Sequence, residues 1–280
     1  MIIGIIPNEK KPKSFDLAKE IISFLSSHNV TAATEDRFTK NLNCKSLSEI
    51  NPSKVDFLIG MGGDGTILHL FHKYKEFDYP LLGINLGEVG FMSDVPEDEI
   101  QKNLQEIITK KYCIKERMVI EGHLGKSGKI LAANDLVLHR GKNHNMIELA
   151  IYVDGGYFNT FKADGIIIAT PTGSTAYSLA AGGPILAPQL NAITLTPICP
   201  HTISYRPAVI SGDHEIEIKY LSNLTHPIEV WSDGIDAMPM YTDETVKAKK
   251  SKKKFRLVKL DSHDFYSVLR TKLRWLGKLS

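Results

Sequence analysis

The fold is decided by the stretch Val55-Asp56-Phe57-Leu58-Ile59-Gly60-Met61-Gly62-Gly63-Asp64-Gly65-Thr66. Val55 to Gly60 is a mainly apolar run that predicts a strand buried on both faces. A glycine cluster follows, and Thr66 to Tyr74 has the apolar spacing of a helix start. A buried strand, a glycine turn and a helix in this order predict an α/β sheet.

Segments on both sides of this stretch repeat the pattern. Ile2 to Ile6 is an almost unbroken β-branched run, and Ser14 to Leu25 places its apolar residues near the helical period. Pro80 to Asn85 is a third apolar strand. Because apolar strands alternate with amphipathic helices, we predict a doubly wound, Rossmann-like α/β domain over residues 1–113.

The pattern changes after about Tyr112, where short strand-like runs separated by turn residues begin. These runs are Met118 to Leu124, Asp135 to His139, Met146 to Val153, Gly165 to Ala169, Ala192 to Thr196, Glu215 to Tyr220 and Pro227 to Trp231. They predict a β-rich, sandwich-like domain over residues 114–255. Ser262 to Leu276 has helical spacing and predicts a last helix that needs a surface to pack on.

Composition is that of an ordinary globular protein, and we expect neither a nucleic-acid nor a membrane partner. The 280 residues are 42% hydrophobic, and a net charge of +2 exerts little pull on a nucleic acid. Three cysteines form no CxxC pair, so we expect neither a disulfide framework nor a thiolate metal site, and a cytoplasmic location. Every apolar run is far shorter than the roughly 20 residues of a membrane span.

The turn that contains Gly62, Gly63, Gly65 and Thr66 is the sharpest chemical signal. Glycines let backbone N–H groups approach phosphates, and the N-terminus of the following helix adds partial positive charge. A dinucleotide-binding dehydrogenase would carry an acidic ribose ligand about 20 residues further on, but the next strand ends at Asn85. The turn therefore predicts phosphate binding and disfavours hydride transfer.

Asp64 puts a carboxylate in the middle of this turn, where it would repel an anion unless it has a chemical role. It could accept a proton from an attacking hydroxyl, or help to hold a cation that screens phosphates. It could equally do no more than cap the following helix, since aspartate is favoured at helix N-termini. The turn alone does not distinguish a catalytic or cation-binding role of Asp64 from a helix cap.

A second signal is the segment Thr170 to Pro184, which follows an apolar strand. Its glycines and small hydroxyl residues permit close approach of a flat or polyanionic ligand, and Tyr177 offers a stacking face. The alternative is a plain strand-to-helix turn, with Ser174 or Thr175 as the cap and Tyr177 in the core. The segment is too long and too rich in glycine for a cap alone.

A third signal is the pair Asn134 and Asp135. An amide beside a carboxylate can satisfy the mixed donors and acceptors of a purine edge and a ribose diol. The same pair is also common in ordinary turns.

Together these segments resemble the NAD kinase family. The motifs that carry the resemblance are Gly62-Gly63-Asp64-Gly65-Thr66, Gly83-Ile84-Asn85-Leu86-Gly87, Asn134-Asp135, Asp164-Gly165, Gly173-Ser174-Thr175-Ala176-Tyr177-Ser178, Gly182-Gly183-Pro184, His201-Thr202-Ile203 and Arg206-Pro207. They cover most of residues 55–235. The glycine turn also occurs in diacylglycerol-type lipid kinases and phosphofructokinases, whereas the Thr170 to Pro184 segment is far more specific.

The resemblance implies an enzyme that transfers the terminal phosphoryl group of ATP, or of a related donor, to the adenosine 2′-hydroxyl of NAD to give NADP. It implies Mg²⁺ accompanying ATP, with NAD bound between an α/β domain and a β-rich domain. It also implies that residues 256–280 return to the first domain, where the last helix packs. Family members are generally homo-oligomers, so we expect a dimer or tetramer.

The same resemblance assigns roles to individual residues. Asp64 would accept the proton of the attacking hydroxyl, and Gly65 with its neighbours would face the phosphates. The further NAD contacts that it implies are His69, Asn134, Asp135, Asn145, Lys162, Asp164, Thr175, Ala176, Tyr177, Ser178 and Ala180. The chain departs from the usual family residues at Glu88, Asn145 and Lys162, and Lys162 lacks the bidentate fork of arginine.

Two other functions remain open at this point: a lipid kinase that shares the glycine turn, and a dinucleotide-binding sensor that has lost catalysis. Three further features receive no function. Lys247 to Lys254 predicts a solvated turn, and Gly125-Lys126-Ser127 predicts a hairpin because Ile120 stands where a Walker A glycine would be. His69 and His72 share a helix face without a third ligand, so we predict no bound transition metal.

Overall fold

The computed structural model describes residues 1–87, 90–93, 95–125, 128–202, 204–260 and 264–275. The chain forms two compact units, one made of Met1–Glu116 with Phe255–Ser280 and the other of Arg117–Lys254. Each unit has a hydrophobic core of its own.

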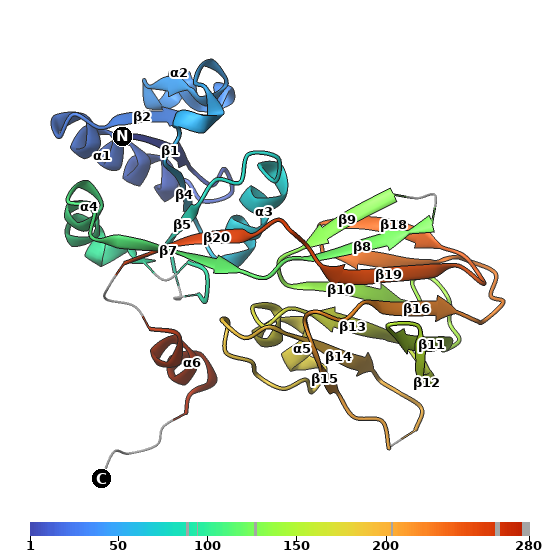
Figure 1. The fold of residues 1–280 in the computed structure, drawn as a ribbon. Coiled ribbons are helices and arrows are strands. Elements are labelled where there is room, and N and C mark those ends of the chain that lie inside the picture. The colour runs from blue at the N-terminus through green and yellow to red at the C-terminus, as the bar shows by residue number, and fades with distance from the viewer. Residues whose placement is uncertain (88–89, 94, 126–127, 203, 261–263, 276–280) are drawn as a thin grey trace, which may run out of the picture. The chain divides into compact units, whose positions relative to one another are not determined.

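The first unit is built on an eight-stranded sheet in the order β3-β2-β1-β4-β5-β20-β7, with β6 paired to β5 (Figure 1). The strands are β1 (Ile2–Ile6), β2 (Thr31–Thr34), β3 (Lys45–Ser46), β4 (Phe57–Met61), β5 (Leu81–Asn85), β6 (Val95–Pro96), β7 (Tyr112–Arg117) and β20 (Phe255–Leu260). From β3 to β5 all neighbours are parallel. Because the strand order reverses between β1 and β4, the carboxyl ends of these two strands form the crevice where such sheets bind ligands.

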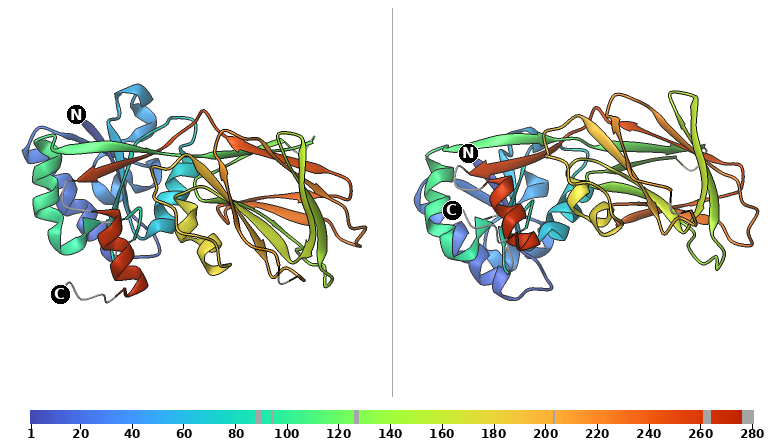
Figure 2. Two further views of the ribbon diagram at one scale, coloured as in Figure 1. Left: turned by 60° about the horizontal axis from the view of Figure 1, so that its bottom comes forward. Right: turned by 90° about the horizontal axis from the view of Figure 1, so that it is seen from below.

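Helices cover both faces of this sheet. They are α1 (Lys13–Ser27), α2 (Thr39–Leu42), α3 (Asp64–Lys73) and α4 (Ile100–Ile108). Ile59 of β4 belongs to the core cluster that α1 and α4 complete. The next residue, Gly60, faces α3, since a Cβ there would lie 2.5 Å from Leu70. Figures 1 and 2 show α3 across the sheet from α1 and α4. The predicted doubly wound α/β domain is confirmed.

The last helix, α6 (Phe265–Leu273), belongs to the first unit. Val268 and Leu269 are buried, and the Phe265 ring lies 5.8 Å from the ring of Phe91. The predicted packing of the last helix on the first domain is therefore confirmed. The preceding strand, β20, pairs in parallel with β5, so it adds to the first sheet.

The second unit consists of two six-stranded sheets, in the orders β15-β14-β13-β10-β17-β18 and β12-β11-β16-β19-β8-β9. The strands are β8 (Ile120–Leu124), β9 (Gly128–Ala132), β10 (Asp135–His139), β11 (Ile147–Val153), β12 (Gly156–Ala163), β13 (Gly165–Ala169), β14 (Ala192–Ile198), β15 (Ala208–Ser211), β16 (Ile216–Tyr220), β17 (Ile228–Ser232), β18 (Asp236–Met240) and β19 (Thr245–Lys250). Alternate residues such as Ile166 and Ile168 of β13 enter a core shared with the other sheet. The predicted β-rich, sandwich-like domain is confirmed.

The lysine-rich block Lys247 to Lys254 differs from the prediction of a solvated turn. Its first half lies in β19, where Ala248 is buried and Lys247 pairs with Glu217 at 2.9 Å. The prediction was wrong there because a buried alanine between paired lysines satisfies the two-residue strand period. The hairpin at Gly125 is confirmed, since β8 pairs antiparallel with β9, while Lys126 and Ser127 lie outside the described residues.

None of the helices in the described part of the chain is both long and apolar enough to span a membrane.

Candidate active site

The crevice at the carboxyl ends of β1 and β4 is a cavity of about 560 Å³. One wall is the segment Ile6 to Lys11 after β1, and the other is the glycine turn with the first residues of α3. Gly63, Gly65 and Thr66 line it, as does the exposed side chain of His69. The sheet topology therefore brings the predicted phosphate-binding turn to the expected ligand crevice.

The glycine turn presents an open helix N-terminus to this cavity. Gly62 has a φ of 155°, and a Cβ there would lie 2.2 Å from the Thr66 hydroxyl, so a larger residue does not fit. Gly63 and Gly65 have nothing within 4 Å of a Cβ position. Since the first N–H groups of a helix have no carbonyl partner within it, the start of α3 is suited to an anion.

Asp64 is the first residue of α3, but its carboxylate does not cap that helix. Oδ1 accepts hydrogen bonds from the backbone N–H of Met92 at 2.9 Å, from the N–H of Ser93 at 3.0 Å and from the Ser93 hydroxyl at 3.1 Å. Oδ2 accepts one bond, from the N–H of Phe91 at 2.9 Å. The capping interpretation is wrong, because these four donors come from the segment after β5.

Neighbouring strands hold this segment in place. The side-chain amide of Asn85, at the end of β5, donates to the carbonyl of Ser93 at 3.2 Å, and Lys259 of β20 donates to the carbonyl of Phe91 at 3.4 Å. Gly90 approaches so closely that a Cβ would lie 2.0 Å from Asp64 Oδ1. Asn85 thus supports the loop that positions Asp64. A dehydrogenase would carry an acidic ribose ligand near this place in the sequence.

The second unit has a cavity of about 370 Å³ that gathers four of the predicted site residues. Asn134, Asp135, Ala176 and Tyr177 all line it, and the Tyr177 side chain is 44% exposed, so it does not lie in the core. Sequence reasoning missed the other residues of this cavity, which are Val137, His139, Trp231, Asp233 and Gly234.

Asp233 organises this cavity. Its carboxylate accepts hydrogen bonds from the backbone N–H groups of Ala133, Asn134 and Asp135 at 2.8, 2.8 and 3.0 Å. Asp233 and Gly234 have φ values of 50° and 65° and connect β17 to β18. An Asp-Gly pair between two strand-like runs is a hairpin signal that the sequence did offer.

Asn134 and Asp135 have the properties of ligand-binding groups. Asn134 is 8% exposed, and its side-chain oxygen has no hydrogen-bond partner among the described residues. Burial, together with the charge of Asp233, raises the pKa of Asp135 to about 7. An unsatisfied buried acceptor is costly, so a donor supplied by a ligand would relieve it.

The segment Thr170 to Pro184 is no simple helix cap. The helix α5 (Tyr177–Ala180) starts without a side-chain cap. Ser174 is buried and its hydroxyl accepts from the N–H of Leu186 at 2.9 Å, while Gly173 would place a Cβ 2.1 Å from the Asn134 carbonyl. Glycine is required there because two backbone segments meet.

The remaining predicted residues do not line either cavity. The Ser178 hydroxyl is buried against that of Thr196 at 2.9 Å, and Thr175 bonds the carbonyl of Thr172. Asp164 pairs with Arg140 at 2.8 Å. The exposed residues of this group are Ala180, Asn145 and Lys162. Glu88 lies outside the described residues.

Within the ranges that the structure describes, no group of three or more histidine, cysteine, aspartate or glutamate side chains could hold a metal ion.

Comparison with known proteins identifies the family. Residues 3–112 match the ATP-NAD kinase N-terminal domain, and residues 133–260 match the ATP-NAD kinase C-terminal domain. The chain belongs to the NAD kinase family. It is 50% identical to the NAD kinase of Protochlamydia amoebophila, over 99% of both chains, and 36% identical to that of Citrifermentans bemidjiense, over 98% of both.

Solved structures agree with the NAD kinase assignment. Yeast NADH kinase in complex with NADH superposes with a TM-score of 0.85 at 27% identity, covering 100% of this chain and 89% of that one. An NAD kinase from Archaeoglobus fulgidus in complex with ATP superposes with a TM-score of 0.78 at 26% identity, covering 99% and 100%. The chain is thus an NAD kinase, which phosphorylates NAD to NADP with ATP. The lipid-kinase and non-catalytic sensor hypotheses are set aside.

Gly90→Ala should lower the kcat of NADP formation about 100-fold. The new Cβ would lie 2.0 Å from Asp64 Oδ1, so the carboxylate must move. On the hypothesis that Asp64 accepts the proton of the attacking hydroxyl, a displacement of this size costs about that factor. Steady-state kinetics with a thermal melt measure both effects. Gly87→Ala is the matched control, because its Cβ would lie 3.8 Å from the nearest atom, and equal kinetics for the two variants would contradict the prediction.

The free energy of unfolding of the Asp135→Asn variant, relative to that of the wild type, should increase as the pH rises. Because the folded-state pKa of Asp135 is about 7, the folded protein retains a proton that the unfolded chain has released. The free energy of unfolding of the wild type should therefore fall between about pH 4 and pH 7, and by about 2 to 3 kcal/mol between pH 5 and pH 8. The neutral amide lacks this dependence. Urea unfolding of both proteins at pH 5 and pH 8 measures the difference between their free energies of unfolding. A difference that is the same at both pH values would contradict the prediction.

Proposed function

We propose that Asp64 is the proton acceptor in phosphoryl transfer to NAD. The observation that carries this proposal is the unequal use of its two oxygens, since Oδ1 accepts three hydrogen bonds and Oδ2 only one. A carboxylate offers about four acceptor positions, so capacity remains on Oδ2. The adenosine 2′-hydroxyl would donate to that oxygen and lose its proton to it.

In this step the 2′-oxygen forms a bond to the terminal phosphorus of ATP, and the bond from that phosphorus to the bridging oxygen breaks, releasing ADP. The N–H groups at the start of α3 would face the donor phosphates, with Gly62, Gly63, Gly65 and Thr66 forming the turn. Such preorganised dipoles stabilise charge that develops on the transferred group. The open Cβ positions of Gly63 and Gly65 support this role.

We propose that the cavity of the second unit binds the nucleoside of NAD. Asn134 and Asp135 would recognise its polar edge, and Tyr177 and Trp231 would cover its faces. The unsatisfied oxygen of Asn134 supports this placement. We assign Asp233 a positioning role, because it orders the backbone that carries both residues. His69, Asn145, Lys162, Asp164, Thr175, Ser178 and Ala180 stay proposed contacts from the family resemblance alone.

We further propose that Mg²⁺ enters with ATP. We infer that the donor phosphates and water supply most of its ligands, as is usual for this ion, since the described residues contain no group of three or more histidine, cysteine, aspartate or glutamate side chains that could hold it. The cation would neutralise charge on the donor. We also propose a division into a catalytic domain, 1–113 with 256–280, and an NAD-binding domain, 114–255, with a dimeric or tetrameric assembly in the cytoplasm.

Asp64→Asn should reduce kcat by about 10²- to 10⁴-fold, because the amide cannot accept the proton. NADP formation from NAD and ATP, followed with an NADP-specific dehydrogenase, measures it. Ser93→Ala removes one donor to Oδ1 and leaves the carboxylate, so it should lower kcat far less. If the Asp64→Asn enzyme keeps more than a tenth of the wild-type kcat, a proton-accepting role is ruled out.

Removal of divalent cations should abolish activity reversibly. Excess EDTA should stop NADP formation, and Mg²⁺ added beyond the chelator should restore it, because uncompensated donor phosphates repel the nucleophile. The thermal melting temperature without ATP should stay unchanged by EDTA, since the cation is proposed to arrive with the donor. Undiminished turnover in EDTA would contradict the proposal.

A further inference from the structure

The first unit has a second cavity, of about 480 Å³, beside the phosphate crevice. The two cavities share Glu35, Arg37 and Lys73 as lining residues, so they meet at these side chains. The crevice continues from there to the glycine turn, and the second cavity continues to the end of α3 and the segment Leu47 to Pro52. The two cavities are therefore neighbours within a single unit.

Away from the shared charged residues, much of the wall of the second cavity is aromatic and aliphatic. Phe77 and Tyr79 stack with ring centroids 5.4 Å apart and an interplanar angle of 16°, and Tyr74 lies 5.8 Å from Tyr79. Leu47 and Ile50 line the same space. The Phe77 side chain is 48% exposed. A flat aromatic ligand would gain stacking and cover this surface.

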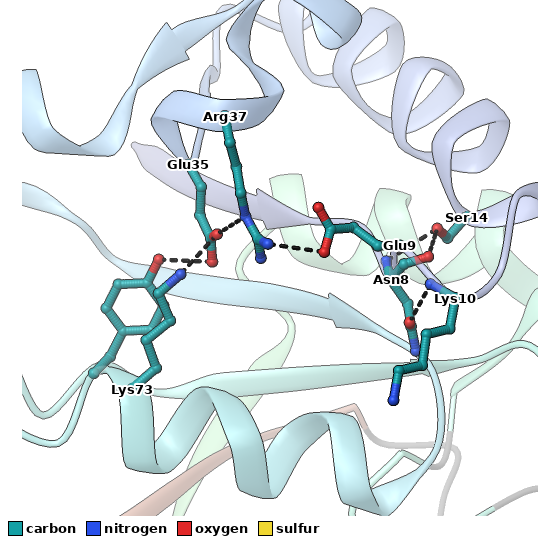
Figure 3. Close-up of polar contacts among 8 residues, drawn as sticks. Asn8, Glu9, Lys10, Ser14, Glu35, Arg37 and Lys73 are labelled. Atoms are coloured by element: carbon teal, nitrogen blue, oxygen red, sulfur yellow. Dashed lines mark hydrogen bonds and ion pairs between the residues drawn. The ribbon is translucent and has the colours of Figure 1, made fainter.

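A network of hydrogen-bonded charges stands where the two cavities meet (Figure 3). Glu35 is 6% exposed and accepts from Arg37 Nε at 2.7 Å, from Lys73 Nζ at 2.7 Å and from the Tyr74 hydroxyl at 3.1 Å. Arg37 also reaches Glu9 at 2.8 Å. Burial raises the pKa of Glu35, but the hydrogen bonds from Lys73 and Arg37 outweigh it and the net pKa is lowered. The acid is therefore ionised, and it holds both cations at the junction.

The two cavities differ in charge. The crevice is lined by four basic side chains and two acidic ones, namely Lys10, Lys11, Arg37, Lys73, Glu9 and Glu35. Lys10 and Lys11 make no ion pair within the described ranges. The second cavity has two of each sign, Arg37, Lys73, Glu35 and Asp36. A crevice with more basic than acidic side chains, leading into an aromatic pocket whose charges balance, matches a polyanionic tail attached to a neutral aromatic base.

The length of α3 fits the same ligand. The glycine turn and the aromatic residues lie at opposite ends of α3, whose ten residues span about 15 Å. An extended nucleoside triphosphate has a length of this order, so phosphates at the turn would bring its base to the aromatic end.

We propose that the pocket formed by Leu47, Ile50, Tyr74, Phe77 and Tyr79 binds the base of the nucleoside triphosphate donor. This inference rests on the proposed placement of the donor phosphates at the glycine turn. The base stacks on the Phe77 and Tyr79 side of the pocket, and the triphosphate passes Lys73 and Arg37 to reach Lys10, Lys11 and the start of α3.

The test compares the binding of ATP and inorganic tripolyphosphate, which lacks a base, to the full-length protein by isothermal titration calorimetry without NAD. The double variant Phe77→Ala, Tyr79→Ala should weaken ATP about tenfold and tripolyphosphate less than twofold, because only the base loses its contacts. Its KM for ATP should rise by the same factor with kcat and the KM for NAD unchanged. Phe77→Trp keeps an aromatic face and should retain ATP affinity. Tyr241→Ala, an exposed tyrosine of the other unit, is the matched control.

Other results would overturn the base pocket. Equal weakening of ATP and tripolyphosphate would mean that the aromatic residues support the crevice instead of binding a base. Unchanged ATP binding in the double variant would also overturn the base pocket. If light scattering then showed a smaller assembly for that variant, the aromatic face would be a subunit interface. The phosphate placement is tested separately by Lys10→Ala, Lys11→Ala, which should weaken both ligands alike. If that variant weakens neither ligand while the aromatic variant weakens ATP alone, the proposed phosphate contacts of Lys10 and Lys11 fail, and the contact of the base with the aromatic residues is still supported.

Discussion

The hydrogen bonding of the Asp64 carboxylate to the segment Gly90 to Ser93 is the constraint on which the first unit depends. It joins the turn after β4 to the segment after β5, so the ends of two neighbouring strands are tied together. Because the carboxylate is directed away from its own helix, the first N–H groups of α3 stay available to an anion. A residue that would otherwise repel phosphate is thereby held by donors of the protein itself.

The second unit uses the same physical device. The Asp233 carboxylate takes three successive backbone N–H groups, those of Ala133 to Asp135, and so orders a loop whose side chains face a cavity. Hydrogen bonds to a charged acceptor are stronger than neutral ones, which makes them effective for loops that lack a regular ladder. A buried acid, Asp135, lies nearby, and its pKa is raised by burial and by the charge of Asp233.

Local chemistry and tertiary contact contribute differently to the two cavities of the first unit. Glycines and a helix start suffice to make an anion-binding turn, and both are visible in the sequence. The aromatic pocket needs side chains from two separated segments of the chain. Glu35, from a third segment, holds Arg37 and Lys73 between the two cavities. Tyr74, Phe77 and Tyr79 follow a helix without any distinctive spacing, so no sequence pattern marked them.

The sequence by itself determined the α/β domain, the β-rich domain, the glycine turn between a buried strand and a helix, and the family, because hydrophobic period and glycine spacing are local properties of the chain. It also indicated Asn134, Asp135 and Tyr177, which share a cavity. Only the tertiary structure decided what Asp64 bonds, since its partners lie 27 to 29 residues away. The same is true of Asp233, about 100 residues from its donors, and of Ser178, whose hydroxyl faces Thr196 instead of a cavity. Such contacts arise when strand order brings distant loops together, and no local pattern encodes which of them meet.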